Sequence, residues 1–196
     1  MVQYGIIGLA IAAILIVGLQ VRPQGIFPSQ GTLQIAFTNG VPSIEFAPPS
    51  SSVACHGNCS ATSLNITVAS VEVHTSGIDN MTGEWTHVCN NQTPLSFDII
   101  KLTNLAQVMC GSNIQPETIT NVRMNVTSAS AKISGMGTVN LTVPSGKLEI
   151  PVSPLANVQA GKTTTIVVDF QPHIVCQGTG DCKLTPVLHA RPTGPE

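Results

Sequence analysis

The sequence predicts a mainly β protein: an antiparallel β-sandwich of about eight strands with one short helix, preceded by a single N-terminal hydrophobic helix. Three observations lead to this prediction. Apolar and polar residues alternate with period two in several short segments, as they do in half-buried strands. Stretches that contain Gly or Pro separate these segments, and one uninterrupted apolar run opens the chain.

The opening run, from Tyr4 to Leu19, has no polar side chain except the tyrosine hydroxyl. Continued to Val21, it gives ~18 helical residues or roughly 27 Å, which is just enough to cross a hydrocarbon core. No Lys or Arg precedes the run and no A-x-A site follows it. We therefore favour a retained transmembrane or filament-core helix over residues 1–21, with a cleaved signal peptide as the alternative.

Three small residues, Gly5, Gly8 and Ala12, share one face of this helix and would let another helix pack closely. The helix that packs on this face could belong to a membrane partner or to a like subunit. After it, residues 22–30 form a connector, residues 31–190 the extracellular body and residues 191–196 a tail.

The body contains eight period-two segments that are expected to form its strands. Between Val68 and Val71 the apolar parity slips by one residue, which predicts a bulge or a change of sheet edge. The one helix-like patch runs from Phe97 to Met109, and Asp98 is expected to cap it. The strand segments are Thr32–Thr38, Leu64–Thr75, Glu84–Val88, Ile119–Ala131, Thr138–Val143, Lys147–Val152, Thr163–Phe170 and Leu184–Ala190.

The composition argues against a nucleic-acid binder. Only 9% of the residues are charged, the net charge is −2, and aromatic residues make up 4% of the chain. A nucleic-acid binder needs a basic face, and base stacking needs exposed aromatic rings. We therefore expect no nucleic-acid partner.

Six cysteines indicate an exported body that contains disulfides. Six cysteines allow 15 connectivities. The spacing favours two short closed loops, Cys55–Cys59 and Cys176–Cys182, and leaves Cys89–Cys110 for a longer one. A metal site is the alternative, because His56 lies between the first two cysteines.

Six N-x-S/T sequons predict N-linked glycans and support the same compartment. In three of them the asparagine alternates with apolar residues, so a half-buried strand would point it to solvent. The sequons lie at Asn58, Asn65, Asn80, Asn91, Asn125 and Asn140. The single nearby charge, Arg22, would by the positive-inside rule be cytoplasmic, but the cysteines and sequons favour a body outside the cell.

Seven segments follow one another along the chain, namely GTLQIAFTNGVP, ITVASVEVHTSG, SFDIIKLTN, ITNVRMNVTSASA, LTVPSGKLEIPV, VQAGKTTTIVVDFQP and LTPVLHA. In this order they resemble the domain of unknown function 4382 family. The resemblance covers about residues 31 to 190 and includes the single tryptophan, Trp85. It implies an exported β-sandwich of archaeal or bacterial origin, and it transfers no catalytic residue.

The sequence contains no common catalytic or nucleotide-binding motif, so we expect neither an enzyme nor a cofactor. His74 and His87 flank an expected hairpin and could face one another across two strands. With His173 or His189 as a third ligand they would form a metal site, although nothing in the spacing requires one.

These features favour a glycosylated, disulfide-linked cell-surface protein whose β head is carried by an apolar helix. The first hypothesis is a structural subunit of a pilin-like filament, by analogy with archaeal pilins. The second is a single-span accessory subunit that caps the outer side of a larger membrane complex. A metal or ligand carrier that uses His74 and His87 is the third.

Overall fold

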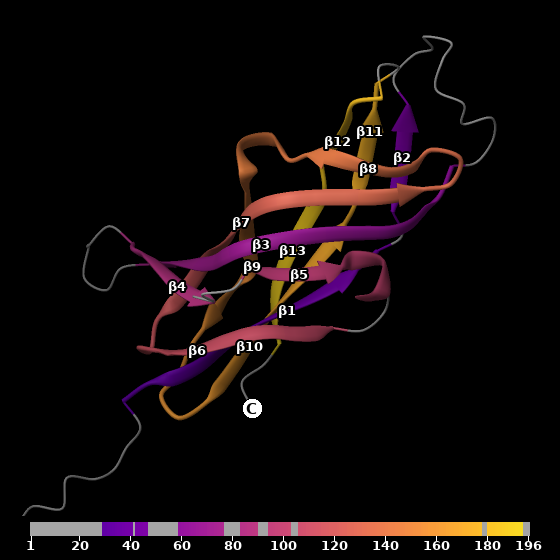
Figure 1. The fold of residues 1–196 in the computed structure, drawn as a ribbon. Helices are drawn as coiled ribbons and strands as arrows, with labels where there is room; N and C mark the ends of the chain where they lie inside the picture. The colour runs from indigo at the N-terminus through magenta and orange to yellow at the C-terminus, as the bar shows by residue number, and fades with distance from the viewer. Residues whose placement is uncertain are drawn as a thin grey trace, which may run out of the picture.

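Thirteen strands and two 3₁₀ turns make up the described part of the chain (Figure 1). The structure, a computed structural model, describes residues 29–40, 42–46, 59–76, 83–89, 94–102, 106–177 and 180–193. The prediction of a mainly β protein is confirmed.

The elements are β1 (Gly31–Asn39), β2 (Ser43–Phe46), β3 (Ala61–Ser76), β4 (Trp85–Cys89), β5 (Leu95–Asp98), η1 (Ile99–Leu102), β6 (Gln107–Ile114), β7 (Thr118–Ile133), β8 (Gly137–Thr142), η2 (Pro144–Gly146), β9 (Lys147–Asn157), β10 (Thr163–Gln171), β11 (His173–Cys176), β12 (Cys182–Leu184) and β13 (Val187–Thr193).

The two longest strands, β3 and β7, pair antiparallel along their whole length and organise one half of the sheet. The other edge of β3 is taken by β5 and then by β4. The other edge of β7 is taken by β9 over residues 118–125 and by β8 over residues 130–133. The order across this half is therefore β4 and β5, then β3, then β7, then β8 and β9.

The second half continues from β9 through β13, β10 and β1 to β6. Along the chain, β1 is followed by β2, β10 by β11 and β12 by β13. The short strands β2, β11 and β12 pair with one another in that order, and β12 also pairs with β8. Four of these pairs are parallel, namely β1–β10, β2–β11, β8–β12 and β9–β13. The expected antiparallel arrangement is therefore wrong for these four pairs. Period-two alternation indicates which side of a strand is buried, but it does not indicate the direction of the neighbouring strand.

The two ends of this strand order meet. Cys89 on β4 is linked to Cys110 on β6, with the two Cα atoms 5.7 Å apart. The rings of Phe37 on β1 and Phe97 on β5 stack with centroids 5.4 Å apart. The sheet thus folds over so that β4 lies beside β6 (Figure 1), and its inner face encloses the core.

The core consists of the inward-facing residues of nearly every long strand. On β9, Leu148, Ile150 and Val152 are buried while the residues between them are exposed. The largest fully buried side chains include Phe37 and Phe170, which lie on the adjacent strands β1 and β10. Burial of each such side chain contributes about 1.5–3 kcal/mol, so apolar packing is the main stabilising contribution.

The predicted helix over Phe97–Met109 is wrong. Its first residues end β5, one 3₁₀ turn follows over Ile99–Leu102, and its last residues lie in β6. Asp98 does cap the turn, because its Oδ1 accepts the Ile100 N–H at 3.2 Å and also the Leu64 N–H at 2.9 Å.

The parity slip after Val68 coincides with register shifts in the β3–β7 pair, so the predicted bulge is confirmed. Strand β13 ends at Thr193, inside the segment expected to be a tail. Four strands have no counterpart among the predicted segments, namely β2, β5, β6 and β11, which are all short or edge strands. The last predicted segment covers parts of both β12 and β13.

Gly31 allows a close approach between β1 and the loop after β9. A Cβ atom at this position would collide with the Gln159 carbonyl oxygen and lie 2.7 Å from Val158 Cγ1. We expect Gly31→Ala to lower the free energy of unfolding by about 1–3 kcal/mol, as measured by urea denaturation, because backbone must shift.

The matched control for Gly31→Ala is Gly40→Ala, directly after the same strand. There a Cβ atom meets only the exposed Gln171 side chain, whose Cγ lies 3.2 Å away and can move. Equal losses of stability in the two variants would contradict the proposed role of the Gly31 contact.

Candidate functional site

Charged and aromatic side chains gather on the outer face of β3, β4 and β7. The register pairs Glu72 with His87 on β4 and with Arg123 on β7, and it pairs His74 with Trp85. Directly paired residues point to the same face of a sheet, and the residues of β3 on either side of Glu72 are buried in the core. These five residues form what we call the Trp85 cluster.

The carboxylate of Glu72 is the centre of the cluster. Its Oε2 accepts hydrogen bonds from Arg123 Nε at 2.8 Å and from Nη2 at 2.5 Å. Its Oε1 accepts one from Asn125 Nδ2 at 3.4 Å and lies 3.5 Å from His87 Nδ1. Glu72 is only 8% exposed, so these partners replace the water that a carboxylate otherwise requires.

Arg123 also contacts the tryptophan ring. Its guanidinium carbon lies 3.8 Å from the centroid of Trp85, which is a cation–π contact. The His74 ring meets Trp85 edge-on at 5.1 Å. These contacts hold β4 against β3 and β7 through side chains on the solvent side.

The hydrogen bonds of His74 define its tautomer when the ring is neutral. The Thr120 hydroxyl donates its single proton to the His74 carbonyl oxygen at 3.2 Å. The same hydroxyl oxygen lies 2.9 Å from His74 Nδ1, so Nδ1 donates to it and Nε2 carries the lone pair. The backbone of Gly83 packs against this ring, where a Cβ atom would lie 2.9 Å from Nε2.

The histidines do not assemble into the metal site considered from the sequence. His74 and His87 lie on one face of adjacent strands, but one pairs with Thr120 and the other with Glu72. His173 and His189 lie on β11 and β13. Within the described ranges, no group of three or more His, Cys, Asp or Glu could hold a metal ion.

A second polar group, which sequence reasoning missed, joins β2 to β11. Ser43 Oγ lies 2.8 Å from His173 Nδ1, and Glu45 Oε2 lies 3.3 Å from His173 Nε2. The Glu45 side chain is 68% exposed, so this contact is well solvated. The parallel register of β2 and β11 pairs Ser43 with His173, although the two residues are 130 positions apart in the chain. No local sequence pattern could therefore have predicted this contact.

Three of the six sequon asparagines lie in the described strands, all on the outer face of the β3–β7 half. Asn65 on β3 and Asn140 on β8 are exposed. Asn125 on β7 is half-buried, and its Nδ2 donates to Ser70 Oγ at 2.6 Å as well as to Glu72. The alternation therefore indicated the correct face for all three.

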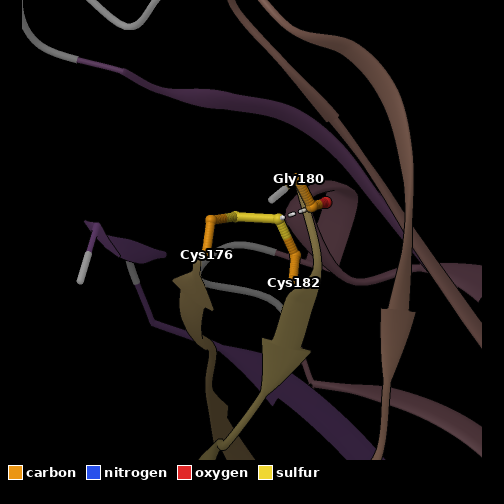
Figure 2. The surroundings of a disulfide bond; sticks show 3 residues. All are labelled: Cys176, Gly180 and Cys182. Atoms are coloured by element: carbon orange, nitrogen blue, oxygen red, sulfur yellow. Dashed lines mark hydrogen bonds between the residues drawn. A yellow bond between two sulfur atoms is a disulfide. The ribbon is translucent and has the colours of Figure 1, made fainter. Parts of the chain in front are cut away.

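The structure contains two of the expected cysteine pairs. Cys89–Cys110 joins the two ends of the strand order, and Cys176–Cys182 links the paired strands β11 and β12 (Figure 2). Cys182 Sγ also lies 3.8 Å from the Gly180 carbonyl oxygen. Cys59 is itself disulfide-bonded. These disulfides indicate that the domain is located in an oxidising environment, as extracellular proteins are.

Several predicted features lie outside the described residues. They are the apolar helix with Gly5, Gly8 and Ala12, the cysteine Cys55, and the sequon asparagines Asn58, Asn80 and Asn91. Among the residues that are described, no helix is both long and apolar enough to span a membrane.

Comparison with known proteins identifies one family. The profile described as Domain of unknown function (DUF4382) matches residues 30–186, which is more than half of the chain. No curated protein and no solved structure matches the chain. The matched region begins just before β1 and ends between β12 and β13.

Proposed function

The chain belongs to the DUF4382 family, and from this premise we propose that it is a non-enzymatic, N-glycosylated, disulfide-containing cell-surface protein. Its β-rich head is held outside the cell by the N-terminal apolar helix. In this proposal the chain is a structural subunit of a pilin-like filament, whose helices pack against one another in the filament core.

One observation carries the proposal: an uncharged apolar run, Tyr4–Leu19, precedes a disulfide-linked β body by only a short connector. An apolar helix of this length must be buried in lipid or among other helices. The disulfides and the outward sequon asparagines support an extracytoplasmic head.

A second candidate is a single-span accessory subunit that caps the extracellular side of a membrane complex. The small residues Gly5, Gly8 and Ala12 favour it, because they would let the helix dock among the helices of other subunits. The same residues serve helix packing in a filament, so the location of the intact helix must separate the two candidates.

The test is mass spectrometry of N-terminal peptides from native protein in two fractions, sheared surface material and detergent-extracted membranes. A filament subunit is expected to give the intact apolar peptide in sheared material. An unrelated multi-span membrane protein, measured in both fractions, controls for membrane fragments released by shearing.

The outcomes separate the candidates. The intact peptide found only in membranes, together with stoichiometric partner subunits, would overturn the filament and support the accessory subunit. A mature chain that begins after Val21 would overturn both, since neither works without the helix.

A further inference from the structure

The three described sequon asparagines differ in how their amide groups are bonded. An asparagine amide carries two hydrogens, and N-glycosylation replaces one of them with a sugar. Asn140 makes no side-chain hydrogen bond within the described residues. Asn65 donates once, to Ser63 Oγ at 3.0 Å, and remains exposed. Both therefore keep an amide hydrogen that faces solvent.

Asn125 is different, because both of its amide hydrogens have acceptors. Nδ2 donates to Ser70 Oγ at 2.6 Å and to Glu72 Oε1 at 3.4 Å, and the side chain is half-buried beside the Trp85 cluster. A sugar on this nitrogen would remove one of these bonds. It would also have to occupy space beside a carboxylate that is only 8% exposed.

The two open asparagines lie in one line across the sheet. The register pairs Asn65 with Ser130 on β7, and Ser130 with Asn140 on β8. Adjacent strands are about 4.8 Å apart, so the two Cα atoms lie about 10 Å apart on the same face. The residue between them on β7 is Ser130, whose side chain is small.

We propose that Asn65 and Asn140 carry a pair of N-glycans over the outer face of β3, β7 and β8, and that Asn125 remains unmodified. This inference rests on the proposed function, since it requires export.

The sugar donor in the transfer reaction is a lipid-phosphate-linked oligosaccharide. A bond forms between Nδ2 and the sugar C1, the C1–O bond to the lipid phosphate breaks, and the amide proton passes to a base of the transferase.

The experiment is mass spectrometry of proteolytic glycopeptides from the full chain, purified from a host that exports and N-glycosylates it. Peptides with Asn65 and Asn140 are expected to carry glycan, and the peptide with Asn125 is expected without it. Asn65→Gln and Asn140→Gln should each remove the mass of one glycan. Asn125→Gln should leave the mass of the attached glycans unchanged.

Two further variants test the physical reason. Thr142→Ala keeps Asn140 but destroys its sequon, so the glycan there should be lost without a change at the asparagine itself. Ser70→Ala frees one amide hydrogen of Asn125, so occupancy of Asn125 should rise from zero. Unchanged occupancy of Asn125 in this variant would overturn the hydrogen-bond explanation.

The outcomes distinguish this inference from the function on which it rests. Glycan on Asn125 of the unaltered protein, or bare Asn65 or Asn140 while other sequons are occupied, would overturn the inference alone. A protein without glycan at any of its six sequons would overturn the N-glycoprotein assignment itself.

Discussion

Replacing both Cys89 and Cys110 with alanine is expected to lower the free energy of unfolding by about 3 kcal/mol. The disulfide closes a loop of 21 residues, and chain-entropy estimates for such a loop give about this value. It also joins β4 and β6, which otherwise pair only with β3 and with β1 among the described strands. Urea denaturation followed by circular dichroism measures the loss.

The matched control for this double variant is Cys176→Ala with Cys182→Ala. That disulfide closes only 6 residues, so the same estimate gives a loss of about 2 kcal/mol. Hydrogen exchange should also become faster along β6 in the first double variant and stay unchanged there in the control. A larger loss of stability in the control would contradict the role assigned to Cys89–Cys110.

Arg123→Met is expected to destabilise the fold by about 3 kcal/mol, because it leaves the carboxylate of Glu72 in a site that is 8% exposed without its main partner. Methionine has an unbranched apolar side chain, so the change mainly removes the charge and its hydrogen bonds. Trp85 is the only tryptophan, so its fluorescence reports both unfolding and the loss of the stacked guanidinium.

Two comparisons make the Arg123 experiment specific. The double variant Glu72→Leu with Arg123→Met removes the unpaired charge and should recover most of the lost stability. Glu45→Ala removes an exposed contact with His173 and should change stability by less than about 1 kcal/mol. If Arg123→Met were no more costly than Glu45→Ala, the Glu72 carboxylate would not depend on its arginine.

The error at Phe97–Met109 shows a limit of periodicity. Apolar residues three or seven positions apart, such as Ile99, Leu102 and Met109, are typical of a helix. In the structure the same spacing arises because a strand, a 3₁₀ turn and a second strand each place apolar residues toward the core. Short elements give too few repeats for the two patterns to be separated.

The Trp85 cluster could be predicted only in part. The alternation in β3 indicates that Glu72 and His74 share one outward face, and the hairpin to β4 brings His87 and Trp85 near them. Arg123 lies 51 residues from Glu72, and only the register of β3 against β7 brings it opposite. No local pattern reports register between distant strands.

The sequence by itself determined the mainly β class, the buried side of the long strands and the outward face of the three sequon asparagines that lie in described strands. These are local properties, because side chains alternate across a strand whatever its neighbours are. The tertiary structure alone decided which strands pair and in which direction. It also decided which asparagine amides are already bonded. Those outcomes depend on packing between residues far apart in the chain, where many pairings satisfy the same local pattern.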